Sequence, residues 1–506
     1  MTRDDTILLY NPNPEKDRPS LDVPLSLLAA SKYLDKAGYK IKIIKDNLYE
    51  NHLDVLREAA KNSPIMGVSA MTGYQIHDGL EACKIAKEAN KDIKFIWGGY
   101  HPTIYPIQTL ENPYVDIVVK GKGEMAFYEL IERIVEGESL EGLEGVYWKE
   151  NGKVFSNPDR AQAPLDDDPP MPYHLVDIEK CLFASEFGKR TISYVSSYGC
   201  PYSCTFCVEV GVFNRRWVGL RADLVVNDLE RLEKEYGVDA INFYDSLFFV
   251  SVKRAKGILQ GVLDRKLTVR LGNLYGRSRQ LNQSDDELWE LLEKTRTYSI
   301  LCGAESGDQD ALDIMNKEMD VEDNIKFAKK CQDYGIKVIF STLVGVPFPD
   351  HTYEEIKKKT DEQIEATLNL FDKCLSFDSR HRGLMFIYAP YPGTPMYDEA
   401  VKLGFKAPTS LEDWSKLDLL GQLTPWVTKQ QADLVNMMSQ FIFMFFATDT
   451  IVWAKEKVEN RLYKRIFIMA FKIMGSVAKM RWKYKYFNYP IDYKMLLMAR
   501  SVNRWI

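Results

Sequence analysis

The chain lacks the features that mark secreted and membrane-spanning proteins. Its 506 residues include only eight cysteines, too few for a disulfide-stapled secreted fold, so we expect a reducing compartment. The opening stretch "MTRDDTILLY" contains no apolar signal segment. The apolar runs at 441–447 and 466–471 are far shorter than the roughly 20 residues that a membrane-spanning helix needs. These shortages favour a cytoplasmic protein.

The composition also excludes a disordered chain. Apolar residues make up 45% of the sequence, aromatic residues 12% and charged residues 27%, which predicts a globular protein with an ample core. The length suggests about two to four domains. The net charge of −6 is unevenly spread, because residues 461–506 hold eleven Lys or Arg and one acid, Asp492, which leaves −16 on residues 1–460.

Residues 1–150 are predicted to form an α/β domain. Short apolar runs alternate with amphipathic helical patterns, which indicates a parallel sheet doubly wound by helices, of the Rossmann or flavodoxin-like kind. Such sheets bind ligands beyond the carboxyl ends of their strands. The expected strands cover 6–10, 40–45, 65–70, 93–99 and 115–121, and the expected helices include 23–38 and 77–90.

A linker and a second α/β region follow. Residues 151–190 contain "NPDRAQAPLDDDPPMPYH", whose prolines and aspartates are typical of a linker. Residues 191–408 then show six strand–helix units, which predicts a partial (β/α)6 barrel of the TIM type with its chemistry at the strand carboxyl ends. Residues 409–506 are predicted to form a helical C-terminal domain. The expected barrel strands are 191–197, 239–245, 267–273, 299–306, 337–345 and 383–390.

The stretch "YGCPYSCTFC" (198–207) places Cys200, Cys204 and Cys207 just after the first barrel strand. Thiolates bind soft metals, and three of them would hold three irons of a four-iron cube and leave the fourth iron free for a small molecule. A structural zinc site would need a fourth ligand, for which Glu209 and a more distant His174 are the candidates. Three cysteines gathered by chance are the remaining alternative.

The cysteine stretch "CPYSCTFC" resembles the signature of the radical S-adenosylmethionine (SAM) superfamily, Cys-x-x-x-Cys-x-aromatic-Cys. The resemblance implies a [4Fe–4S] cluster on the three cysteines, which binds SAM and cleaves it to a radical. Later strand ends also match: "FYDSLFF" (243–249), "GAESG" (303–307), "LVGVPFPD" (343–350) and "YAPYPGTPMY" (388–397). The SAM contacts implied by these matches are Phe206, Asp245, Glu305, Ser306 and Gly345.

The N-terminal domain is similar to the cobalamin-binding domain that precedes the barrel in the B12-dependent branch of this superfamily. The strand ends "NPNP", "SAMTG", "GGYHPT" and "GKGE" stand where that branch cradles the corrin. The stretch "KDNLYENH" has Asp46 but no histidine at the spacing of a cobalt ligand, so we expect cobalt without a histidine on its lower face. The implied cobalamin contacts are Ser69, Thr72, Gly98, Gly99, His101, Gly121 and Glu124.

The basic tail over 461–506 mixes Lys and Arg with aromatic and aliphatic residues. One interpretation is an amphipathic helix that makes peripheral contact with an anionic membrane surface. Another is a helical cap packed on the acidic barrel with its charges in solvent. Nucleic-acid binding is the least favoured reading, and we expect no nucleic-acid partner.

Together these resemblances predict a cobalamin-dependent radical SAM enzyme, similar to the class B methyltransferases. We expect it to methylate an unactivated carbon of a small-molecule or lipid substrate, with a flavodoxin- or ferredoxin-like electron donor. One alternative is a non-methylating relative that performs a cyclisation or oxidative rearrangement on a tetrapyrrole or lipid. A non-catalytic cobalamin-binding sensor is the alternative from another class.

Overall fold

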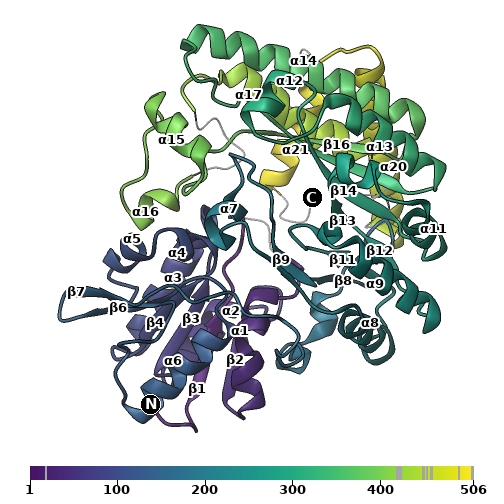
Figure 1. The fold of residues 1–506 in the computed structure, drawn as a ribbon. Helices are drawn as coiled ribbons and strands as arrows, with labels where there is room; N and C mark the ends of the chain where they lie inside the picture. The colour runs from purple at the N-terminus through teal and green to yellow at the C-terminus, as the bar shows by residue number, and fades with distance from the viewer. Residues whose placement is uncertain are drawn as a thin grey trace. The chain divides into compact units, whose positions relative to one another are not determined.

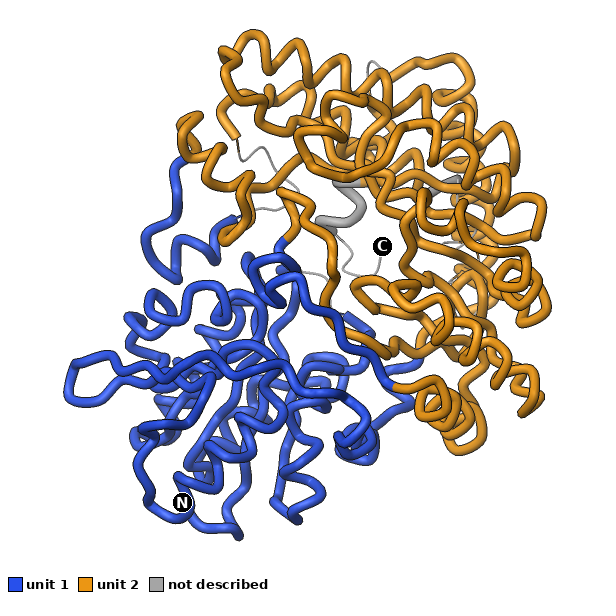
Figure 2. The backbone as a smooth tube through the Cα atoms, in the orientation of Figure 1, with its two compact units in different colours: residues 1–182, 208–220, 406–419 blue, residues 183–207, 221–405, 420–506 orange. Residues whose placement is uncertain are grey.

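The computed structural model describes residues 1–16, 20–417, 424–446, 460–487 and 490–502, together with residues 451, 454, 455 and 458. The chain forms two compact units, drawn in different colours in Figure 2. Unit 1 comprises Met1–Leu182, Val208–Leu220 and Lys406–Leu419, and unit 2 comprises Phe183–Cys207, Arg221–Phe405 and Leu420–Ile506. Both units are therefore discontinuous in sequence. The domain boundaries expected at 150, 190 and 408 stay a prediction.

Unit 1 is built on a seven-stranded sheet in the order β2-β1-β3-β4-β5-β6-β7 (Figure 1). The first five strands of that order are parallel, and β6 and β7 extend the sheet as an antiparallel hairpin. Strand β1 reads "TILLY" and is buried along nearly its whole length, as expected for a parallel strand covered on both faces. The strands are β1 Thr6–Tyr10, β2 Lys40–Ile44, β3 Ile65–Ser69, β4 Lys94–Gly98, β5 Ile117–Val119, β6 Val146–Glu150 and β7 Lys153–Ser156.

Helices cover the two faces of this sheet in pairs. Helix α1 packs against α6, and α2 packs against α3, as the right-handed crossovers of a doubly wound sheet require. Strand β1 lies between β2 and β3, so the chain reverses its winding direction there, and the ligand end of such a sheet is at this switch point. The helices of unit 1 are α1 Leu25–Lys36, α2 His52–Ala60, α3 Tyr74–Ala89, α4 Tyr100–Ile104, α5 Pro106–Glu111, α6 Glu124–Glu136, η1 Tyr173–Leu175, η2 Ile178–Cys181, α7 Val208–Phe213 and α16 Leu411–Trp414, with strand β10 Trp217–Gly219.

Unit 2 contains the partial barrel. Its parallel strands form two ladders, β12-β11-β8 and β13-β14-β15-β16. The ladders separate at Asn273, which lies between β12 and β13 with a φ of 55°. The expected strand 267–273 contains β12, and β13 lies beyond it. The Asn273 backbone N–H and side chain bond to Ser299 and Asn242 on the neighbouring strands. The strands are β8 Thr191–Tyr194, β9 Ser197–Gly199, β11 Ala240–Phe243, β12 Arg270–Gly272, β13 Leu274–Gly276, β14 Ser299–Glu305, β15 Lys337–Val344 and β16 Arg382–Ile387.

The helices of unit 2 wrap the barrel strands and continue into the C-terminal region. Helix α14 begins with a capping box in which Thr352 and Glu355 each accept a hydrogen bond from the other's backbone N–H. The helices are α8 Ala222–Tyr236, η3 Phe248–Val250, α9 Val252–Asp264, α10 Ser278–Asn282, α11 Asp286–Lys294, α12 Gln309–Ile314, α13 Val321–Asp333, α14 Tyr353–Phe377 and α15 Pro395–Lys402. The predicted fold class is confirmed: a doubly wound N-terminal region, a barrel-type second region and a helical C-terminus.

The C-terminal region is helical where it is described. Its elements are α17 Lys429–Met437, the π-helical turn η4 Met438–Ile442, α18 Phe443–Phe446, α20 Arg461–Lys483 and α21 Ile491–Val502. Residue 447 of the apolar run and residues 488–489 and 503–506 of the basic tail lie outside the described residues. In the part of the chain that is described, none of the helices combines the length and apolar character needed to cross a bilayer.

Candidate functional site

The loop that carries the three cysteines is fixed to the rest of unit 2 through Thr205. Its backbone N–H donates to the Met315 carbonyl at 3.0 Å, and its hydroxyl donates to the Ile314 carbonyl at 2.9 Å. The Thr205 carbonyl accepts from the Met396 N–H at 3.0 Å. Gly199 turns the chain into the loop with a φ of 80°, a conformation that favours glycine. These hydrogen bonds fix the loop to the end of α12 and to α15.

Cys200, Cys204 and Cys207 form no disulfide within the described residues. Cys204 is buried, the other two are half-buried, and burial raises the pKa of Cys200. Over the described ranges, no three His, Cys, Asp or Glu side chains are placed to hold a single metal ion. The two candidate fourth ligands for zinc belong to unit 1: Glu209 accepts from the Tyr100 hydroxyl at 2.6 Å, and His174 contacts Asp35 at 2.9 Å.

Arg277 contributes a positive charge beside the cysteine loop. Its Nη1 lies 3.5 Å from Cys204 Sγ, and its Nη2 donates to the Lys317 carbonyl. The guanidinium carbon is 3.7 Å from the centre of the Tyr202 ring, which is a close cation–π contact. Three thiols beside a buried cation fit an iron–sulfur cluster, since thiolates are soft ligands and the cation offsets the negative charge that thiolates and cluster add. Sequence reasoning missed Arg277, although it directly follows a barrel strand.

Glu305 ends strand β14 in an unusual conformation. Its φ is 58°, and the pairing of β14 with β15 shifts register between Gly303 and Glu305. Its Oε1 accepts from Lys317 Nζ at 2.6 Å, and both side chains are more than nine-tenths buried. Burial alone would lower the pKa of Lys317, but the attraction of Glu305 and Cys204 outweighs it and raises that pKa. Non-glycine residues held in the left-handed region concentrate at functional sites.

Asp245 connects the ends of two barrel strands. Its carboxylate accepts from the Ser196 N–H at 2.7 Å and from the hydroxyls of Ser196 and Ser197, both at 2.6 Å. Arg254 in turn donates to the Ser196 carbonyl at 2.9 Å. Burial raises the pKa of Asp245. The structure thus shows Asp245 bonded within the barrel, and its expected contact with SAM stays a prediction.

The other expected SAM contacts have different surroundings. Phe206 is half-buried. Ser306 is fully buried and accepts from the Asp308 N–H at 3.1 Å. Gly345 has a φ of 73° and sits against Val427, which a Cβ would meet at 2.6 Å. Trp426 Nε1 donates to the Gly345 carbonyl at 3.0 Å. The structure brings Cys204, Arg277, Lys317 and Glu305 into one connected set of contacts, which Phe206, Ser306 and Gly345 do not join.

In unit 1, the expected cobalamin contacts gather at the carboxyl ends of β3, β4 and β5. Ser69 and Gly98 end β3 and β4. Gly99 has a φ of 98°, and a Cβ there would lie 2.8 Å from the Ala70 carbonyl oxygen. Gly121 has a φ of 80° and donates to Thr103 Oγ1 at 2.9 Å, and the buried Glu124 begins α6. These glycines let the backbone take a shape that other residues would obstruct.

His101 is a buried polar residue at this edge of the sheet. It is 0% exposed, and Nδ1 lies 3.0 Å from the Thr72 hydroxyl. Its Nε2 has no hydrogen-bond partner within the described part of the chain, and burial lowers the His101 pKa to about 3. Its ring packs at 5.5 Å from Trp414, which comes from the distant segment 406–419. An orphaned buried nitrogen beside a glycine-shaped strand edge fits a bound cofactor that supplies the missing hydrogen bond.

His52, the last residue of the stretch "KDNLYENH", has a packing contact. It begins α2, and its ring stacks on Tyr10 at 6.3 Å. The five cysteines outside the loop are buried, as expected for core residues: Cys83, Cys181, Cys302, Cys331 and Cys374. Trp414 is a further residue that sequence reasoning missed, because nothing in its local pattern connects it with a strand end some 300 residues earlier.

Two family models match separate parts of the chain. Residues 21–131 match the family model of the B12 binding domain, and residues 194–361 match that of the radical SAM superfamily. The chain belongs to the cobalamin-dependent radical SAM enzymes. Its predicted cofactors are therefore confirmed as a [4Fe–4S] cluster, SAM and cobalamin, and its classification as an enzyme is confirmed as well.

Three curated relatives of this radical SAM enzyme cover most of its length. An uncharacterized methyltransferase of Pyrococcus horikoshii is 29% identical over 403 residues, covering 79% of this chain and 83% of the relative. The cytidylyl-2-hydroxyethylphosphonate methyltransferase of Streptomyces wedmorensis is 23% identical, with the same coverage. The anaerobic magnesium-protoporphyrin IX monomethyl ester cyclase of Rubrivivax gelatinosus is 28% identical, covering 88% of this chain and 78% of the relative. Methyltransferase is thus the family activity that these names favour.

Solved structures share the fold of this radical SAM enzyme. TsrM from Kitasatospora setae, a radical SAM methyltransferase solved with cobalamin and a [4Fe–4S] cluster, superposes with a TM-score of 0.69 at 16% identity, covering 95% of this chain and 100% of that chain. OxsB, solved with aqua-cobalamin and SAM, gives a TM-score of 0.68 at 19% identity, covering 99% and 75%. The individual site residues of the present chain remain predictions.

Proposed function

We propose that this enzyme methylates an unactivated carbon of a small-molecule or lipid substrate. The observation that carries the proposal is the presence of both parts in one chain, a B12 binding domain and a radical SAM domain, in a family whose relatives are named methyltransferases. When bound, the cluster, SAM and cobalamin together supply radical formation at a C–H bond and a transferable methyl group.

The residues of unit 2 have proposed roles around the cluster and SAM. Cys200, Cys204 and Cys207 hold the cluster, and Arg277 donates to the Cys204 sulfur. Glu305, held in position by Lys317, borders SAM together with Phe206, Asp245, Ser306 and Gly345. The Glu305 carboxylate is buried, so a ligand hydroxyl that reaches it forms a strong charge-assisted hydrogen bond in a low-dielectric site.

The residues of unit 1 have proposed roles around cobalamin. Gly98, Gly99 and Gly121 let the cofactor approach the backbone, and Ser69, Thr72 and Glu124 provide polar contacts. His101 stays neutral, with Thr72 on Nδ1, and offers Nε2 to the cofactor. Because the burial of His101 opposes a positive charge, this contact is a hydrogen bond of a neutral imidazole.

The deciding experiment measures both SAM-derived products under anaerobic turnover. The methyltransferase proposal predicts that S-adenosylhomocysteine and 5′-deoxyadenosine form together, and that both require substrate. The second candidate is a ring-forming reaction, favoured by the cyclase relative that matches 88% of this chain. Formation of 5′-deoxyadenosine without S-adenosylhomocysteine would overturn methylation and support cyclisation.

The substrate can be found by comparing the metabolites and lipids of strains with and without the protein. The strain without the protein should lack a methyl group on one compound.

Two finer partner proposals accompany the function. A flavodoxin- or ferredoxin-like protein supplies the electron that cluster reduction needs, which is tested by replacing dithionite with such a donor in the turnover assay. The basic C-terminal region contacts a membrane surface.

A further inference from the structure

Helix α20 has two apolar faces, only one of which packs against the protein. Phe471, Ala478 and Trp482 are buried and face the core at helical spacing. A second apolar row recurs every three or four residues on the outward side, with one longer step. Its members and exposed fractions are Leu462 66%, Ile466 47%, Met469 62%, Ile473 56% and Met480 55%. A helix that exposes such a row in solution is a candidate interaction surface.

A row of positive charges runs beside this outward apolar row. It consists of Arg461, Arg465, Lys472, Lys479 and Lys483, which repeat at the spacing of one helix face. Helix α20 contains no acidic residue, and among the described residues none of these five side chains forms a salt bridge. By contrast, Arg481 is paired with Asp492 at 2.6 Å and Lys485 with Asp372 at 2.5 Å. The cations that stabilise the fold are thus separate from those on the outward side.

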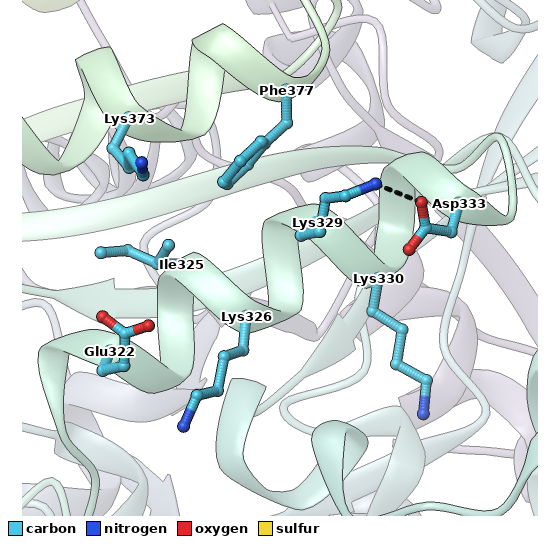
Figure 3. A pocket seen from close by; sticks show the side chains of 8 residues that line it. All are labelled: Glu322, Ile325, Lys326, Lys329, Lys330, Asp333, Lys373 and Phe377. Carbon is cyan, nitrogen blue, oxygen red and sulfur yellow. Dashed lines mark hydrogen bonds and ion pairs between the residues drawn. The ribbon is translucent and has the colours of Figure 1, made fainter.

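Charge alone does not distinguish this helix. A shallow groove between α13 and α14 also gathers lysines, as Figure 3 shows. There, however, an acid stands at each end of the α13 row of lysines, and Lys329 is bonded to one of them, Asp333. The groove is lined by Glu322, Ile325, Lys326, Lys329, Lys330, Asp333, Lys373 and Phe377. Only α20 combines unopposed positive charge with a continuous row of exposed aliphatic side chains within the described structure.

We propose that α20 docks the enzyme on an anionic phospholipid surface. The outward apolar row enters the boundary between headgroups and acyl chains, and the basic row contacts lipid phosphates. The helix lies in the plane of the surface, since it is too polar to span a bilayer. A second copy of the chain is disfavoured as occupant, because two such helices would bring their basic rows together. The inference rests on the membrane contact proposed above for the basic C-terminal region, and it is independent of the proposed methyl transfer.

The test is flotation of the full-length protein with lipid vesicles. We expect binding to vesicles made of equal parts phosphatidylcholine and phosphatidylglycerol, weak binding to phosphatidylcholine alone, and loss of binding at high salt. The double variant Lys472→Glu/Lys479→Glu should weaken binding at least about 25-fold, at about fivefold for each cation removed. The variant Met469→Ser/Ile473→Ser removes apolar side chains and leaves the charge of the helix unchanged. It should also weaken binding to the same anionic vesicles.

The matched control is Lys326→Glu, which reverses the charge of an exposed lysine on α13 rather than on α20. It should bind vesicles as the unchanged protein does, and equal iron content and circular dichroism show that all variants are folded. Equal binding to neutral and anionic vesicles, equal loss in the control, or no binding overturns the proposal. If the protein instead dimerises without lipid, and Met469→Ser/Ile473→Ser abolishes the dimer, a second copy of the chain is the occupant. Binding of single-stranded RNA in place of vesicles would identify a nucleic-acid surface.

Discussion

Lys317 and Glu305 form a buried ion pair in space that only a glycine at position 303 leaves open. Their Nζ and Oε1 atoms are 2.6 Å apart, and a Cβ on Gly303 would lie 2.2 Å from that oxygen and 2.8 Å from that nitrogen. The pair joins the end of β14 to the segment after α12. The carbonyls that hold the cysteine loop come from Ile314, the last residue of α12, and from Met315 in this segment. One ion pair thus connects the proposed SAM residue with the support of the cluster loop.

The two partners of this ion pair should be coupled in their effect on stability. Lys317→Met leaves the Glu305 carboxylate buried and unpaired, which destabilises a protein by about 3–5 kcal/mol. The double variant Lys317→Met/Glu305→Gln should be less destabilised than the sum of the single variants, because no charge is left unpaired. Chemical denaturation of the four proteins measures this coupling. Additive losses in stability would show that the pair contributes no coupling energy.

Arg277 should set the reduction potential of the cluster. Reduction adds negative charge beside the guanidinium, so Arg277→Met removes a stabilising contact and lowers the potential. A charged hydrogen bond of about 1.5–3 kcal/mol corresponds to roughly 60–130 mV for one electron, at 59 mV per tenfold. An anaerobic redox titration followed by EPR measures the change. Arg277→Lys keeps the charge and should give an intermediate value, whereas an unchanged potential in Arg277→Met contradicts the role.

His101 should make the protein sensitive to acid. Its pKa is about 3 in the folded protein and about 6.5 in the unfolded chain, so the unfolded state binds more protons between these values and stability falls as the pH drops through that window. At pH 5 the loss is about 2 kcal/mol relative to pH 7.5 or above. His101→Phe should reduce this loss. His381 is also buried with a lowered pKa, so part of the acid sensitivity remains. Denaturation curves at pH 7.5 and pH 5 measure the difference.

His101 should also matter for cobalamin but not for iron. Replacing it with Phe keeps the ring volume and removes Nε2, so the cofactor loses one hydrogen bond, worth about 1 kcal/mol or about fivefold in affinity. Cobalamin retained after gel filtration is read from its absorbance, and iron content serves as the internal control. The neutral imidazole predicts that retention does not change between pH 6 and pH 8. Equal loss of iron and cobalamin would point to general misfolding instead.

The sequence predicted the sheets well because their strands carry a strong local signal. Strands β1 and β15 consist mainly of buried aliphatic and aromatic residues, and their expected ranges match the observed ones to within one residue. The hairpin of β6 and β7 was not predicted, and β7 lies inside the expected linker 151–190. The break at Asn273 was not predicted. Its left-handed backbone depends on hydrogen bonds to Asn242 and Ser299, which are partners on other strands that no local pattern reveals.

The site was predicted unevenly for a similar reason. Cys200, Cys204 and Cys207 stand within eight residues and carry their own signature, as do the glycine-rich strand ends. Arg277 and Lys317 are single cations beyond the ends of a strand and a helix, where cations are common. They reach the cysteine loop only because the barrel brings separate strand ends to one edge. The contacts of Cys204 with these cations could therefore be found only from the three-dimensional structure.

The discontinuity of unit 1 has a consequence for how the chain is made. A ribosome releases residues 1–182 long before residues 406–419, and domains usually fold as they emerge. Until the later segment appears, His101 lacks the Trp414 ring that covers it, and Gln108 lacks the indole N–H that it binds at 2.7 Å. This edge of the first unit is therefore completed only after every barrel strand has been made, because the last of them, β16, ends at Ile387. A nascent chain thus carries an uncovered His101 until residue 414 has been added.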